Sequence, residues 1–204
     1  MVPNTKFYKF LNEDGRTPQQ GYLWHLPGTG HGPQDTGAWL PTLWGKLEHC
    51  KRGYHVVTLD QAPQWLAPVM WEVDVWGEIN RREDKCVVSN ARLSRKIDLW
   101  NERTQRIFAA DCAEHVLHYW TAKYPDDDRP AKAIQAARDY AEGRITKDAA
   151  NAAANAAAYA AANAAAFAAA NAANAAADAA ADAANAERKW QVEHLREMLN
   201  LYDA

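Results

Sequence analysis

The stretch MWEVDVW, residues 70–76, decides the fold of the first half of this chain. Its apolar residues Trp71, Val73 and Val75 alternate with Glu72 and Asp74. Successive side chains of a strand point to opposite faces, so this alternation places the apolar and the acidic groups on different faces. The stretch predicts a half-buried β-strand with one face against a core.

Three more apolar or β-rich runs flank this stretch: residues 6–11, 54–59 and 85–97. The last of them is long and follows a charged link over residues 80–84. Between two of the runs, Asp60 can cap a short helix whose Trp65 and Leu66 would face the core. These signals together indicate an α+β first half.

The two halves of the chain differ in composition. All but one of the ten glycines lie between Gly15 and Gly77, so the second half is almost free of helix breakers. We expect an α+β domain over residues 1–100, followed by an all-helical, alanine-rich bundle or long helical hairpin over residues 101–204. The expected helices cover about 101–123, 130–142 and 147–201. Cap and stop signals support these ends: Asn101, Asp128 with Pro130, Gly143 and Thr146.

Alanine fills most of residues 148–186, and alanine is the best helix former. Asn, Asp, Tyr159 or Phe167 interrupts the tract every three or four residues. An unbroken helix over 147–201 would be about 80 Å long, so it projects as a rod, folds back near residues 171–174, or pairs with another chain. We expect alanine layers in a tight helix pair, with the two aromatics leaning on a neighbour. An ice-binding face, as in alanine-rich antifreeze helices, is a minor alternative.

Charge and cysteine content restrict the function classes. Lys and Arg number 23 against 26 Asp and Glu, for a net charge of −3, which does not suit a nucleic-acid binder. Three cysteines form no disulfide framework, so we expect a cytoplasmic protein of a bacterium or phage-infected cell. The alanine tract is too weakly apolar to predict a membrane span. An apolar stripe should dock within the chain or form a homodimer: Val192, Leu195, Leu199 and Tyr202.

The candidate ligand residues are mostly aromatic. Trp24 and Trp39 lie in a Gly- and Pro-rich loop and could stack on a base or sugar, or anchor a partner protein. Cys50 lies beside Lys51 and Arg52, which would lower the pKa of its thiol, but we favour a buried structural cysteine at this position.

A short stretch of the expected helix 101–123 holds the candidate metal ligands. Asp111 and His115, and likewise Glu114 and His118, are four residues apart and share a helix face. Glu114 and His118 are the weak candidates for a metal site, and solvated surface pairs are the alternative.

The order Gly53-Tyr54-His55-Val56, a short helix with Ala62 and Trp65, and then residues 71–75 resembles a small domain of phage and bacterial proteins over roughly residues 5–100. It is also similar to the central part of ADP-ribosyltransferase-like folds. That second resemblance implies binding of NAD or another nucleotide near Tyr54 and His55. It makes Glu72 and Glu78 the candidates for the catalytic glutamate by position.

The second half resembles immunity proteins of bacterial toxin systems over about residues 105–190. The residues that match are 110–117, 125–130, 133–138 and 143–146, which precede the alanine tract. This resemblance implies a helical, non-catalytic protein. We therefore expect an interaction protein of phage–bacterium or toxin–immunity conflict that binds a protein or nucleotide and needs no cofactor. The alternative is an ADP-ribosyltransferase-like enzyme or a nucleotide-binding relative, which requires His55 and a carboxylate to face one cleft.

Overall fold

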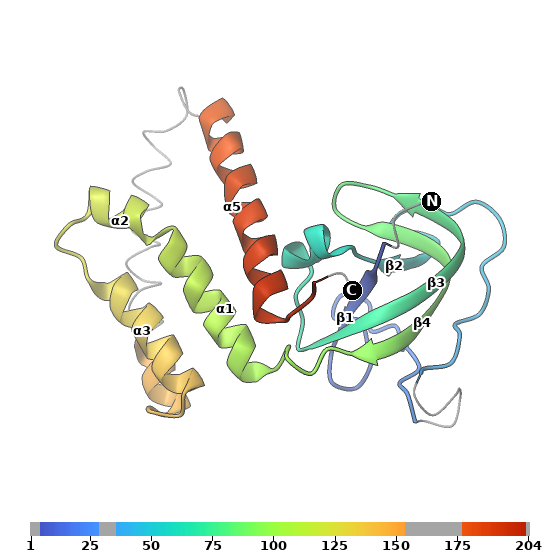
Figure 1. Ribbon diagram of the computed structural model, residues 1–204, viewed down its shortest axis with the longest axis horizontal. Helices are drawn as coiled ribbons and strands as arrows, with labels where there is room; N and C mark the ends of the chain where they lie inside the picture. Colours follow the sequence, from blue (N-terminus) through green and yellow to red (C-terminus); the bar gives the residue numbers. More distant parts are fainter. Residues whose placement is uncertain (1–4, 29–35, 154–176, 203–204) are drawn as a thin grey trace. The chain divides into compact units, whose positions relative to one another are not determined.

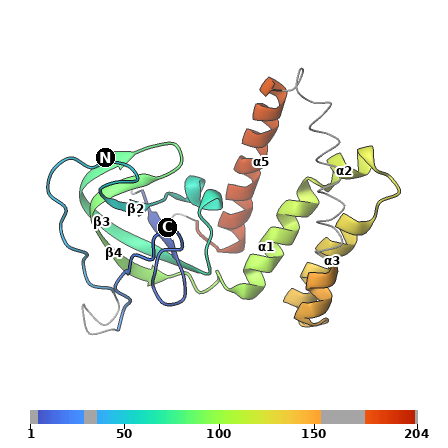
Figure 2. The same cartoon turned by 180° about the vertical axis from the view of Figure 1, so that it is seen from behind.

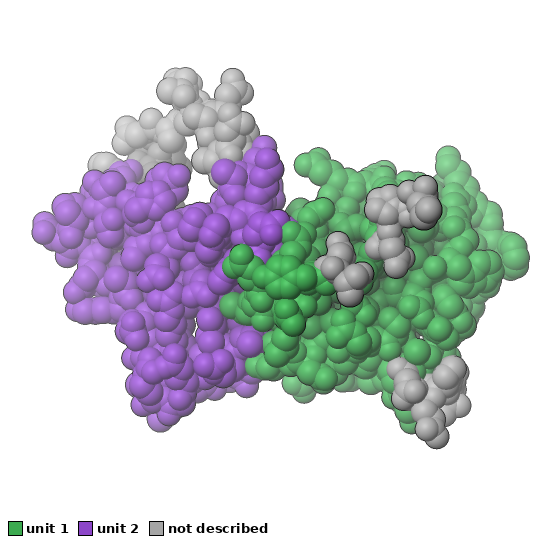
Figure 3. Space-filling view, viewed as in Figure 1, with its two compact units in different colours: residues 1–101, 196–204 green, residues 102–195 purple. Residues whose placement is uncertain are grey.

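The structure is a computed structural model that describes residues 5–28, 36–153 and 177–202. It contains two compact units, which Figure 3 colours separately: residues 1–101 with 196–204, and residues 102–195. Within the described residues, no helix is both long and apolar enough to cross a membrane. The fold is α+β, as expected, with the described strands in the first unit and the described long helices in the second.

The first unit is built on a four-stranded antiparallel sheet in the order β1-β3-β4-β2 (Figure 1). The strands are β1 (Phe7–Leu11), β2 (Tyr54–Val56), β3 (Val69–Arg81) and β4 (Cys86–Lys96). The expected strands over 70–76 and 85–97 are therefore confirmed. β3 extends to Arg81, so the first two residues of the charged link, Asn80 and Arg81, belong to the strand. A tight turn in which Arg82 N donates to Lys85 O completes the hairpin.

The sheet curls until its two edges meet. Tyr8 of β1 and Val57, directly after β2, exchange two backbone hydrogen bonds, with N···O distances of 2.7 and 3.0 Å. Edge strands leave backbone groups unpaired, and this bridge pairs those of Tyr8 and Val57. The inner face of the curled sheet holds the core, which includes Phe7, Trp24, Tyr54 and Trp71.

The short helix after β2 is the 3-10 helix η1 (Leu59–Gln64), and its N-cap is Thr58 rather than Asp60. Gln61 explains the shift, because its side-chain Oε1 accepts a hydrogen bond from Thr58 N at 3.0 Å. The expected core role of Leu66 is wrong, since this side chain is exposed. Trp65 is half-buried, and its indole N–H donates to Asp84 O at 2.7 Å.

The expected helix 101–123 is divided into α1 (Glu102–His115) and α2 (Leu117–Lys123). In an unbroken helix, Tyr119 N would donate to His115 O. Instead Tyr119 N donates to Val116 O at 3.2 Å, and the His118 ring donates to His115 O through Nδ1 at 3.0 Å. A side chain thus replaces the backbone donor and breaks the helix at Val116.

The boundaries of the next helix agree with the sequence signals. α3 (Arg129–Ala141) has Asp128 at its N-cap and Pro130 in its first turn. Gly143 follows with φ +74°, a left-handed conformation that glycine adopts without steric cost. The chain turns back between α2 and α3, so α3 lies beside α1 in both views (Figures 1 and 2).

Thr146 accepts a hydrogen bond from Ala149 N and starts a helical segment over residues 147–153. The middle of the alanine tract, with Tyr159, Phe167 and the expected break at 171–174, lies outside the described residues. The helical hairpin and the ice-binding alternative stay predictions for the same reason.

The C-terminal helix α5 (Ala177–Met198) ends three residues before the sequence suggested. Asn200 has φ +51°, Asn200 N donates to Glu197 O, and Leu201 N donates to Arg196 O. These bonds form a Schellman motif, which turns the chain out of the helix. Val192, Leu195 and Leu199 are buried as the stripe predicted, but Leu201 is buried in place of Tyr202, which is 57% exposed.

Gly53, which precedes β2, lies so close to β4 that replacing it tests the packing of the sheet. A Cβ at Gly53 would lie 1.8 Å from Val87 Cγ1, and φ is +137°. Gly45 also has a positive φ, +93°, but open space around it. Gly45→Ala should lose about 1–3 kcal/mol to backbone strain. Gly53→Ala should lose about 1–3 kcal/mol more from overpacking. Denaturant unfolding of both variants measures the difference, and equal losses would contradict the close approach of Gly53 to β4.

Candidate functional site

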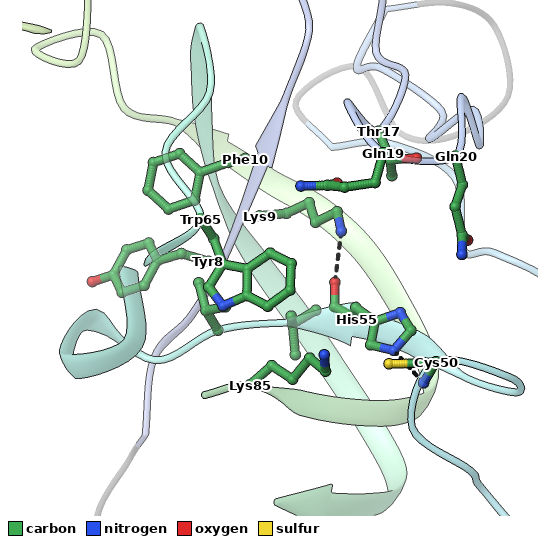
Figure 4. Close-up of a pocket in the computed structure, with 12 residues that line it drawn as sticks. Tyr8, Lys9, Phe10, Thr17, Gln19, Gln20, Cys50, His55, Trp65 and Lys85 are labelled. Carbon is green, nitrogen blue, oxygen red and sulfur yellow. Dashed lines mark hydrogen bonds between the residues drawn. The ribbon is translucent and has the colours of Figure 1, made fainter. Parts of the chain in front are cut away.

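A cavity of about 190 Å³ opens in the first unit where the two sheet edges meet (Figure 4). It is lined by residues from β1, β2, the loop after β1 and the start of β4. The lining residues with polar side chains are Lys9, Thr17, Gln19, Gln20, Cys50, His55 and Lys85, together with Tyr8 and Trp65. The pairing of Tyr8 with Val57 brings these segments together, although they are far apart in the sequence.

Lys9 is the unusual residue of this cavity. It interrupts the otherwise apolar strand Phe7–Leu11, and its ammonium group donates to His55 O at 2.9 Å. The same ammonium lies 5.4 Å from the ring centroid of Trp24. Among the described residues, no carboxylate forms an ion pair with Lys9. Burial therefore lowers the pKa of Lys9 to about 8, since a desolvated charge without a counter-ion is unfavourable.

His55 contributes a neutral ring. Its Nε2 accepts a hydrogen bond from Cys50 N at 3.1 Å, which leaves Nδ1 as the nitrogen that carries the proton. Burial, together with the positive charges of Lys9 and Lys85, lowers the pKa of His55 to about 4. At neutral pH the ring therefore offers one N–H donor and no charge.

Lys85 enters the cavity from the residue before β4. Its side chain is 11% exposed, its ammonium lies 3.1 Å from Asp84 Oδ2, and it stands 4.8 Å from the Trp65 ring centroid. Burial opposes the charge, but the interaction with Asp84 outweighs it and raises the pKa of Lys85. Figure 4 shows Lys9 of β1 and Lys85, the residue before β4, extending toward His55.

Two sequence-predicted site residues lie in the core instead. Tyr54 precedes His55 in β2 and so faces the opposite side; its hydroxyl donates to Pro41 O at 2.7 Å. Trp24 is 2% exposed and packs edge-on against Tyr54 at a centroid distance of 6.0 Å. Neither ring is accessible to a ligand in this arrangement.

Glu72 and Glu78 of β3 are not brought to His55. Glu72 accepts two hydrogen bonds from Arg95, at 2.9 and 2.6 Å, and lines a separate groove with Trp39 and Trp76. Glu78 is exposed, and neither glutamate lines the cavity at His55. The arrangement required for an ADP-ribosyltransferase-like site is therefore not found among the described residues.

Trp39 does reach the surface, as a ligand-binding role would require. It is 40% exposed and meets Trp76 edge to face, with ring centroids 6.5 Å apart. The Arg92 guanidinium lies 4.8 Å from the Trp39 ring centroid and donates to Asp74 at 2.9 Å. This aromatic pair on the outer face of β3 is a second surface able to contact a partner.

The second unit contains a polar network in place of a metal site. Arg138 of α3 donates to Asp111 at 2.6 Å and to Glu114 at 3.0 and 2.6 Å, both on α1. His194 of α5 donates to the other oxygen of Asp111 at 2.8 Å. The metal candidates Glu114 and His118 thus have separate partners. In the described part of the chain, no group of three or more His, Cys, Asp or Glu side chains could hold a metal ion.

Stacked rings join α1 to α5 beside this network. His115 stacks on Trp190 at a centroid distance of 3.9 Å, and Trp190 stacks on His194 at 4.9 Å. His194 in turn stacks on Phe108 at 5.8 Å, and His115 contacts Glu187 at 2.6 Å. Salt bridges, hydrogen bonds and ring contacts therefore fix the three helices α1, α3 and α5 relative to one another.

Lys9→Met should stabilise the protein at pH 7, because it removes a desolvated charge that has no carboxylate partner in the described part of the chain. The folded pKa of Lys9, about 8, lies below its ordinary value of 10.5, so the unfolded chain binds more protons between these values. Wild-type stability therefore rises with pH in this window, by at most about 1.4 kcal/mol per unit, and the advantage of Lys9→Met should shrink. Chemical unfolding at pH 7, 8 and 9.5 measures this.

The other titratable groups near Lys9 could also make stability depend on pH, so a control is needed. His55 stays neutral throughout the window, and Lys85 with Asp84 keeps its charge. Cys50 also lines the cavity, so both proteins are compared again with Cys50→Ser. If Lys9→Met stabilises the protein by the same amount at all three pH values, with Cys50 and with Cys50→Ser, the lowered pKa of Lys9 is contradicted.

Arg138→Met should lower the free energy of unfolding by about 1–3 kcal/mol, because it leaves Asp111 and Glu114 without their shared guanidinium. Asp111 and Arg138 are only 21% and 25% exposed, so solvent replaces the lost contacts incompletely. The matched control is Lys132→Met, which removes an exposed pair with Asp128 and should cost less than about 0.5 kcal/mol. Urea unfolding compares them, and equal losses would mean that the network contributes little.

Comparison with known families assigns the helical region. Residues 95–185 match the model of a family described as "Imm-5 like putative immunity protein". The match includes α1, α2 and α3, and with them Asp111, Glu114 and Arg138 of the network. It confirms the resemblance of the second half and does not extend over the first 94 residues. No curated protein and no solved structure matches the chain.

Proposed function

We propose that this protein is an immunity protein that neutralises a bacterial toxin by binding it, and that the helical unit supplies the binding surface. The observation that carries the proposal is the family match over residues 95–185, which covers the helices α1 to α3. Immunity proteins typically bind a cognate toxin protein. Binding alone can block a toxin, so the protein needs no catalytic residue of its own.

Tyr119 is the best candidate for the centre of that surface. It lies on α2 and is 64% exposed, and it is the large hydrophobic residue that the described part of the second unit leaves in solvent. The His118 ring packs against it, with ring centroids 4.0 Å apart. Exposed aromatic residues with few rotatable bonds are the usual anchors of protein interfaces. The break at Val116 gives α2 its own direction and presents this pair of rings.

The polar network that joins α1, α3 and α5 favours binding by a surface that is formed before the toxin binds. Arg138 joins α3 to α1 at two carboxylates, and His194 joins α5 to the same Asp111. A surface that is rigid before binding loses less conformational entropy in the complex. The network therefore supports tight association even through a small number of anchor residues.

Growth rescue tests the proposal. The toxins encoded beside the protein's gene are expressed one at a time in bacteria, with and without the full chain. We expect rescue from one toxin and a stable complex with it in size-exclusion chromatography and calorimetry. Rescue without a complex, or no rescue from any of these toxins, would contradict the proposal. Light scattering of the chain alone tests the homodimer that the helices also permit.

Tyr119→Ala should weaken the complex by about 30-fold or more, since an interface anchor contributes about 2 kcal/mol or more. Its melting temperature should stay close to that of the wild type, because the side chain is mostly in solvent. The matched control is Lys132→Ala on α3, whose side chain is 71% exposed and which should bind normally. Equal binding by Tyr119→Ala and the wild type would place the interface elsewhere.

A further inference from the structure

The Lys9 cavity in the first unit lies outside the family match and takes no part in the proposed toxin binding. Its defining feature is the half-buried cation Lys9, which has no carboxylate partner among the described residues. Lys9 has three N–H donors, of which one is directed at His55 O. Placing such a group in a sheet edge lowers stability unless something compensates for its charge. A bound anion would supply that compensation.

We propose that this cavity binds a small aromatic anion, a carboxylate or a phosphate monoester, whose charged group meets Lys9 and whose ring occupies the apolar part of the cavity. The inference concerns a ligand site in the first unit. It is independent of whether the helical unit binds a toxin.

The end of the cavity that would receive the ligand's anionic group lies at His55, where several N–H donors come together. Lys9 and Lys85 bring two ammonium groups from β1 and from the start of β4 (Figure 4). Lys85 already has Asp84 as a counter-ion at 3.1 Å, so the two lysines and one carboxylate leave one positive charge in excess. The Nδ1–H of His55 adds a neutral donor, because Nε2 is occupied by Cys50 N. An excess positive charge with several N–H donors suits a small anionic group such as a carboxylate or a phosphate.

The apolar end is defined by the walls that the strands provide. Tyr8, Phe10, Val56, Val57 and Trp65 line the cavity together with the polar groups. The Trp65 indole is fixed by its hydrogen bond to Asp84 O, so this wall is rigid. A dry cavity of about 150 Å³ holds a benzene ring. The cavity here is about 190 Å³, which accommodates a ring of that size and one small charged group.

Calorimetric titration of the full chain with four probes tests the proposal. Benzoate and phenyl phosphate carry both a ring and a charge and distinguish the carboxylate from the phosphate source. Benzamide has the ring without the charge, and inorganic phosphate has the charge without the ring. We expect at least one of the two aromatic anions to bind at least tenfold more tightly than benzamide and inorganic phosphate. Binding of neither aromatic anion, or equal binding of benzamide, would overturn the proposal.

Variants locate the binding in this cavity. Lys9→Met should weaken binding of the aromatic anion at least tenfold while the protein stays folded, because the change removes a destabilising charge. The matched control is Lys6→Met, an exposed lysine three residues earlier, which should leave the affinity unchanged. Equal weakening by both variants, or none by Lys9→Met, would overturn the assignment. If Lys9→Met is poorly folded by circular dichroism, chemical-shift changes of the His55 ring on titration decide in its place.

Discussion

The backbone pairing of Tyr8 with Val57 is the contact on which the architecture of the first unit depends. It joins the two edges of a four-stranded sheet and so turns an open sheet into a curled one. The pairing also places β1 next to β2, and this brings Lys9 to the carbonyl of His55, 46 residues away. The cavity exists because these two edges meet, since its walls come from both of them.

The two units differ in how their partly buried cations are paired. In the helical unit, Arg138 is matched by two carboxylates, and Asp111 is matched in turn by His194. Such a network has its charges and hydrogen bonds satisfied and therefore fixes the helices. In the sheet unit, Lys9 is half-buried, with a carbonyl and an aromatic ring as its neighbours. Groups of the first kind support a structure, while groups of the second kind are typical of sites that receive a ligand.

The family match covers helices of the second unit and leaves nearly all of the first unit's sheet unmatched. The match to the immunity family covers the helices α1 to α3, and their rigid packing suits a surface that binds a protein. The sheet unit adds a small cavity and an outer face with Trp39 and Trp76. Under the two proposals made above, the helical unit binds a protein and the sheet unit binds a small molecule.

The sequence alone determined the elements whose signals are local. Alternation in residues 70–76 predicted β3, and Asp128, Pro130 and Gly143 predicted both ends of α3, because strand periodicity and helix caps act over a few residues. It also indicated the immunity family of the helical region. Tertiary structure decided which titratable groups meet. A lysine inside an apolar strand was the available signal for the cavity, but its meeting with His55 depends on the closing of the sheet. The same holds for Arg138 and Asp111, since long-range packing, unlike periodicity, is not encoded in any short stretch of the chain.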